Sequence, residues 1–164
     1  MSEPAENPVT KPHLTLRFKV NDEDFIMAGE AASKTKKALQ QLGLNQDVVK
    51  NVAIIVYEAA MNIVIHANHG EIQVVIVPGY VTVIAEDEGG GIPDLDLAMQ
   101  EGYSTAPDEV REMGFGAGMG LPNIKHCSDT LNIETRAGTG TTLKATLYLN
   151  QKDGKKLETG ALHV

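Results

Sequence analysis

The stretch VAIIVYEAAMNIVI, from Val52 to Ile65, is a strongly apolar segment with two polar residues in its middle, Glu58 and Asn62. Together with a suitable N-cap residue at Asn45, it predicts a helix that runs to about residue 66. Glu58 and Asn62 are four residues apart, so both side chains project from the same face of this helix. Burying an ionised carboxylate without a partner is costly, so a buried Glu58 needs a compensating group.

Two interpretations of this pair remain open. In the functional one, the Asn62 amide oxygen binds Mg²⁺ and Glu58 takes a proton from a reacting water or hydroxyl. In the structural one, both side chains lie on the exposed edge of an amphipathic helix. His66 extends the same face and His69 follows, but Asn is a poor zinc ligand and the chain has one cysteine. We therefore interpret His66 as structural.

Hydrophobic periodicity and turn residues predict the other elements. In chain order we expect a strand over 13–20, helices over 22–42 and 45–66, strands over 72–77 and 80–85, a short helix over 94–100, a helix over 119–128, and strands over 131–136 and 141–149. Hairpin connections between strands imply a mostly antiparallel β-sheet with helices on one face. The sequence thus predicts an α+β two-layer sandwich.

The domain is expected to span residues 13–150. Residues 1–12 contain three prolines and little apolar surface, which predicts a disordered N-terminal tail, and 151–164 predict a flexible C-terminal one. The chain is 42% hydrophobic but only 4% aromatic, with no Trp, so Val, Ile, Leu and Ala must build the core. A chain of 164 residues is large enough for one compact domain.

Charge and composition argue against several classes of protein. The net charge is -8 and the basic residues are scattered, which disfavours nucleic-acid binding. A single cysteine, Cys127, rules out an intrachain disulfide and fits a reducing compartment. The N-terminus lacks the pattern of a signal peptide, and no run approaches the about 20 apolar residues of a membrane span. We expect a cytoplasmic protein that binds no membrane.

Residues 87 to 120 form a glycine-rich segment, and its length in a small domain indicates a function. Asp87 follows a strand, and Gly89 and Gly91 lie just beyond it. This spacing lets the backbone turn closely around a flat ligand while the carboxylate accepts a hydrogen bond, for example from an adenine amino group. Calcium binding is the alternative, although the EF-hand pattern is missing.

The same segment ends in GFGAGMGLP, with alternating glycines. Such a backbone is mobile and its N–H groups can bind an anion, and the helix expected from Met119 would add its positive end. No Lys follows for a P-loop, and Met119 and Leu121 stand where the dinucleotide fingerprint would need glycine. A flexible linker is the alternative.

Three motifs occur in order: Glu58-x-x-x-Asn62, Asp87-x-Gly89-x-Gly91 and Gly116-x-Gly118-x-Gly120, followed by Gly140-Thr141 at a strand. Over roughly residues 40–149, the chain resembles the GHKL ATPase superfamily with its Bergerat ATP-binding fold. Within that superfamily it is most similar to bacterial anti-sigma-factor serine/threonine kinases and to switch kinases of partner-switching systems.

The resemblance implies that Mg-ATP lies between the helical layer and a lid. It assigns the metal to Asn62, the general base to Glu58, the adenine amino group to Asp87, and a supporting hydroxyl to Thr141, with Thr142 as the alternative. The remaining positions that it places at the nucleotide are Gly89, Gly91, Ile92, Arg111, Gly114, Gly116, Gly118, Met119, Gly120 and Leu121. Arg111 would reach the γ-phosphate, or else is a surface arginine. We expect 114–120 to be disordered without nucleotide.

The resemblance also implies a function. We expect a protein serine/threonine kinase that acts on a separate regulatory protein, either an anti-anti-sigma (STAS-like) protein or a sigma factor. The alternatives are a nucleotide-gated anti-sigma or switch module with little kinase activity, and simple ATP hydrolysis. A homodimer through aliphatic positions of the helix over 22–42 is a further expectation, although core packing explains those positions equally well.

Overall fold

The computed structural model describes residues 14–104, 106, 108 and 119–149. Its elements are the strands β1 Leu14–Asn21, β2 Ala67–Val77, β3 Tyr80–Gly89, β4 Thr130–Arg136 and β5 Gly140–Tyr148, and the helices α1 Phe25–Gln41, α2 Gln46–His66, α3 Leu95–Ala98 and α5 Gly120–Cys127. The tails expected at 1–12 and 151–164 lie outside the described residues.

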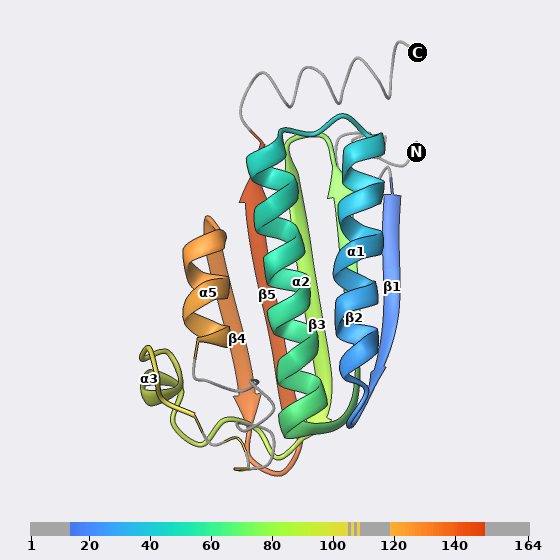
Figure 1. Ribbon diagram of the computed structural model, residues 1–164. Coiled ribbons are helices and arrows are strands. Elements are labelled where there is room, and N and C mark those ends of the chain that lie inside the picture. The colour runs from blue at the N-terminus through green and yellow to red at the C-terminus, as the bar shows by residue number, and fades with distance from the viewer. Residues whose placement is uncertain (1–13, 105, 107, 109–118, 150–164) are drawn as a thin grey trace, which may run out of the picture.

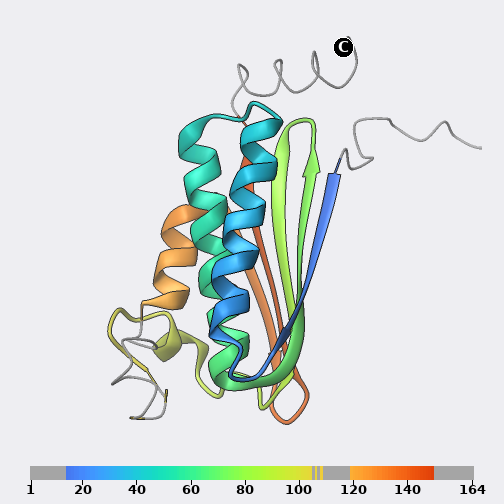
Figure 2. The same cartoon turned by 45° about the vertical axis from the view of Figure 1, so that its right-hand side comes forward.

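The strands form one five-stranded sheet in the order β1-β2-β3-β5-β4, and every neighbouring pair is antiparallel. Helices α1, α2 and α5 lie side by side over one face of this sheet (Figure 1). The turned view separates the helical layer from the sheet, whose other face carries none of the described helices (Figure 2). The predicted two-layer α+β sandwich is confirmed.

Helix α2 is the central element of the helical layer. The Asn45 side chain caps it as predicted, because Oδ1 accepts a hydrogen bond from the Asp47 N–H at 2.8 Å. By length and hydropathy α2 is the one described helix that could pass for a membrane span, contrary to our expectation that no run comes close. Half of that window is buried within the protein, so its apolar character reflects packing in the core.

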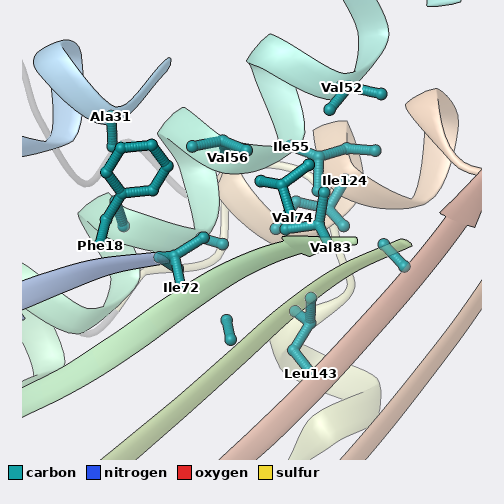
Figure 3. Packing of buried hydrophobic residues seen from close by; sticks show 14 of the residues in the cluster. Phe18, Ala31, Val52, Ile55, Val56, Ile72, Val74, Val83, Ile124 and Leu143 are labelled. Carbon is teal, nitrogen blue, oxygen red and sulfur yellow. The ribbon is translucent and has the colours of Figure 1, made fainter. Parts of the chain in front are cut away.

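The core between the two layers is aliphatic, as the composition predicts. Phe18 is the one aromatic side chain among the buried hydrophobic residues that the structure describes. Figure 3 shows Val56 of α2 and Phe18 of β1 close to Ile72 of β2, with Ile124 of α5 beside Ile55. Each fully buried side chain of this size contributes about 1.5–3 kcal/mol, so this layer anchors all three helices to the sheet.

Strands β2 and β3 are longer than predicted. β2 begins at Ala67, directly after α2, and β3 continues to Gly89, so that Asp87 pairs with Gly70 inside the ladder. Periodicity misses this extension because most of the added residues are polar and show no apolar alternation. The added ends are joined by the backbone ladder and by a side-chain contact, with His69 Nε2 2.8 Å from Glu88 Oε2. The register also shifts between Ala67 and Gly70.

The last hairpin places its second strand inside the sheet, next to the edge strand β4. β5 lies between β3 and β4 and pairs with β3 along its whole length, which sets Thr141 opposite Asp87. Two motifs that are distant in the sequence are thereby brought to the same end of the sheet.

Candidate functional site

A cavity of about 560 Å³ opens at one end of the molecule, between α2, α5 and the sheet. In Figure 1 this is the lower end, where α2 and β3 finish and α5 begins. Its volume is within the range of small-molecule sites. The predicted site residues that line it are Glu58, Asn62, Asp87, Gly91, Ile92, Met119, Gly120, Leu121 and Thr141.

Glu58 and Asn62 meet the first residue of α5 on one wall of the cavity. A Cβ atom added at Gly120 would lie 3.1 Å from Asn62 Oδ1 and 3.3 Å from Glu58 Oε2, so glycine lets the backbone pass close to both side chains. The Asn62 side chain makes no hydrogen bond to the other described residues. Among the described residues, none takes up the amide oxygen that a ligand would use.

Glu58 is half-buried, and burial raises the pKa of its carboxyl because the charged form loses hydration. A hydrogen bond opposes this effect: Asn123 Nδ2 donates to Glu58 Oε1 at 3.3 Å. A carboxylate with a raised pKa is a better proton acceptor, as a general base requires.

Asp87 lies at the opposite wall, on β3. Its Oδ1 accepts hydrogen bonds from the Gly89 N–H at 3.1 Å and the Thr141 N–H at 3.2 Å. Burial raises the pKa of this carboxyl, and these two bonds act in the opposite direction. Since Oδ2 accepts no hydrogen bond from the described residues, one oxygen orients the group and the other is left for a ligand.

A hydroxyl chain supports the same wall from β4 and β5. The Thr135 hydroxyl accepts a hydrogen bond from the Ile92 N–H at 2.7 Å and lies 3.1 Å from the Thr141 hydroxyl. Thr141 lines the cavity, whereas Thr142 lines a separate groove on the other face of the sheet. Of the two threonines considered from the sequence, Thr141 is the one in reach of a ligand beside Asp87.

The remaining predicted site residues divide into two groups. Gly89 does not line the cavity, and its role is to donate the N–H that orients Asp87. Arg111, Gly114, Gly116 and Gly118 lie outside the described residues, as does most of the predicted lid.

The sequence alone missed several residues of the site. Asn123 could have been noticed as an amide in the first turn of an apolar helix, but Thr135 gives no local signal. His66, interpreted as structural, lines the cavity, and burial lowers the pKa of its imidazole.

Comparisons with known proteins give a matching family model and several similar proteins. The family model described as histidine kinase-, DNA gyrase B-, and HSP90-like ATPase matches residues 47–151, which include every motif discussed above. The chain is 30% identical over 118 residues to the serine/threonine-protein kinase RsbT of Bacillus subtilis (strain 168), covering 70% of this chain and 83% of that protein.

One further relative and one solved structure extend the comparison. The chain is 29% identical over 137 residues to the anti-sigma F factor of Geobacillus kaustophilus (strain HTA426), covering 80% of this chain and 87% of the relative. The crystal structure of the SiaB-SiaC complex from Pseudomonas aeruginosa superposes with a TM-score of 0.57 at 17% identity, over 80% of this chain and 88% of that one. At this identity the likeness concerns the fold alone.

Proposed function

Because the chain belongs to the histidine kinase-, DNA gyrase B- and HSP90-like ATPase family, the GHKL superfamily that its motifs resemble, we propose that it is a Mg-ATP-dependent serine/threonine protein kinase acting on a separate regulatory protein. The observation that carries the proposal is that one cavity is lined by Glu58 and Asn62 from α2 and by Asp87 from β3. Similarity to a serine/threonine-protein kinase over 83% of its length supports the same activity.

The residues present fit Mg-ATP. Asp87 would accept a hydrogen bond from the adenine amino group through Oδ2, beside the Thr141 hydroxyl. The first N–H groups of α5 have no partner within the helix, so they would bind phosphate oxygens. Asn62 would coordinate Mg²⁺, which, when bound, neutralises phosphate charge and orients the transferred group. Arg111 and the glycines at 114, 116 and 118 are proposed to complete the phosphate site.

Glu58 would act on the acceptor hydroxyl. Its Oε2 takes the proton of a serine or threonine side chain, the hydroxyl oxygen forms the new bond to the γ-phosphorus, and the bond to ADP breaks. The raised pKa of Glu58 suits this step, since a stronger base holds the transferred proton better. Phosphoryl transfer needs positioning and charge stabilisation more than covalent chemistry, and both can come from this cavity.

The test compares wild-type protein with Glu58→Gln and with Glu134→Gln, an exposed control on β4. Each protein is mixed with magnesium, γ-³²P-labelled ATP and a lysate fraction of the source cells, and the labelled acceptor is then identified and purified. We expect Glu58→Gln to lower transfer at least about 100-fold, the usual range for a general base, while calorimetry with a non-hydrolysable ATP analogue gives unchanged affinity. Wild-type transfer rates in Glu58→Gln would show that the assigned base is wrong.

A second candidate is a nucleotide-gated binding module with little kinase activity. The similarity to the anti-sigma F factor of Geobacillus kaustophilus, over 87% of that protein's length, favours it. The same mixture separates the two candidates, because a binding module would retain its partner in a nucleotide-dependent way without transferring label.

The partner and the setting are proposals of the same kind. A STAS-like regulatory protein would be the acceptor in the kinase and a sigma factor the ligand of the binding module. The lone, partly buried Cys127, which fits a reducing compartment, supports a cytoplasmic location. Homodimer formation is testable by light scattering on the purified chain.

A further inference from the structure

Asn123 connects the helix that follows the lid to the Glu58 carboxylate. It is in the first turn of α5, where its backbone N–H donates to the Met119 carbonyl at 2.8 Å. Its side-chain amide donates to Glu58 Oε1 at 3.3 Å, across 65 residues of sequence. Both side chains are partly buried, and no other hydrogen bond to Glu58 comes from the described residues.

The two carboxylate oxygens therefore have different surroundings. Oε1 is tied to α5, whereas Oε2 is the oxygen next to Gly120, at the start of the same helix and on the cavity wall. A general base needs one oxygen directed at the hydroxyl, and a carboxylate that rotates freely would present that oxygen only part of the time.

We propose that Asn123 is a positioning residue, which holds Glu58 Oε1 so that Oε2 faces the acceptor hydroxyl. This inference rests on the proposed kinase function. It also follows that the first turn of α5 aligns two parts of the site at once, because the turn that begins beside Asn62 also carries the amide that fixes Glu58.

The kinetic test replaces the amide in two ways. Asn123→Leu keeps the number and branching of the side-chain heavy atoms but has no donor, Asn123→Gln keeps a donor, and Lys125→Ala is an exposed control on the same helix. With the purified acceptor of the labelling experiment, we expect Asn123→Leu to lower kcat about 10- to 100-fold, as a misplaced catalytic group does, with KM for ATP changed less than about threefold. Asn123→Gln should recover part of kcat, and Lys125→Ala should match wild type.

A double-mutant cycle shows whether Asn123 acts through Glu58. The Asn123→Leu/Glu58→Gln protein should be no slower than Glu58→Gln alone, since the positioned group is already lost. Additive losses would overturn the inference and indicate that Asn123 has a separate role. If Asn123→Leu instead raised KM for ATP about 10- to 100-fold and left kcat unchanged, the inference would be overturned as well, because Asn123 would then serve nucleotide binding.

A measurement without turnover separates this inference from the kinase itself. In ¹⁵N-labelled protein without nucleotide, the side-chain amide resonances of Asn123 should shift in Glu58→Gln and not in Glu134→Gln. Transfer by wild type together with a normal rate in Asn123→Leu would overturn the positioning role alone. No transfer by wild type would overturn the kinase, and the positioning role with it, whether or not the resonances report the hydrogen bond.

Discussion

The fold holds the Glu58 carboxyl in a partly buried position, where its charged form is disfavoured. Its raised folded-state pKa means that the folded protein binds this proton more tightly than the unfolded chain does. The contribution of Glu58 to stability is therefore fully present below its unfolded pKa of about 4.5 and is lost as the pH rises through the folded pKa. At neutral pH the protein bears the cost of a partly buried charge.

The prediction at this scale is that Glu58→Gln stabilises the protein at neutral pH. The neutral amide keeps an oxygen that accepts from Asn123 and removes the buried charge. The melting temperature of the Glu58→Gln protein should therefore exceed that of wild type at pH 7.5. The difference should shrink towards zero below about pH 4.5, where the wild-type carboxyl is protonated in both states. Glu134→Gln, which changes an exposed side chain on β4 in the same way, supplies the matched control. A constant difference across the pH range would contradict the raised pKa.

Among single residues, those with local signals were predictable from the sequence. Glu58 and Asn62 follow from helical spacing, and Asp87 follows from the glycines around it. The hydrogen-bond partners of Asn123 and Thr135 were not predictable, since these bonds join positions 65 and 43 residues apart. The register of α5 on α2, and of β4 on the loop after β3, exists only in the assembled protein.

At the scale of elements, periodicity predicted which segments are helices and which are strands, but it did not predict the residues at which they begin and end. The Asn45 cap fixed the start of α2 because its signal is a single side chain. The first turn of the expected 22–42 helix is absent, since Asp24 caps the helix instead, with Oδ1 accepting from the Met27 N–H at 3.1 Å. β2 and β3 extend beyond their apolar patterns because most of the added residues are polar and carry no periodic signal.

The pairing of β3 with β5 supplies the prediction at this scale. Gly140 has φ +144°, and a Cβ there would collide with the Asp87 carbonyl oxygen, whereas Gly138 has φ +76° and open space. Gly138→Ala should cost about 1–2 kcal/mol, from the backbone alone. Gly140→Ala should cost about 2–5 kcal/mol, because overpacking adds to the backbone term, and should also weaken nucleotide binding. Urea denaturation and calorimetry measure both, and equal effects of the two substitutions would contradict the close approach.

For the whole molecule, the order of the strands in the sheet could not be predicted from the sequence. Adjacent antiparallel strands were predictable from their hairpins, but the insertion of β5 between β3 and β4 was not, since nothing local to 141–149 marks a central strand. The two-layer arrangement was predictable because the helices are amphipathic and the hairpins antiparallel.

Ligand binding should be visible as stability of the whole molecule. At about 100 times the dissociation constant, Mg-ATP adds about 2.7 kcal/mol, or roughly 5–10 °C in melting temperature for a chain of this size. Removing the metal with EDTA should abolish most of this shift, and Asn62→Ala should reduce it by a similar amount. Asn132→Ala, exposed on β4, should behave as wild type. Equal shifts with and without magnesium would argue against Asn62 as the metal ligand.

The position of β5 between β3 and β4 has a consequence for synthesis on the ribosome. The Asp87 carboxylate is oriented by the N–H of Thr141, which is translated 54 residues later. A nascent chain that ends before β5 already contains Glu58, Asn62 and Asp87, yet it lacks one wall of the cavity and leaves the edge of β3 unpaired. Truncated products should therefore be inactive and prone to aggregate through that edge, and the protein gains nucleotide only when its last strand has been inserted.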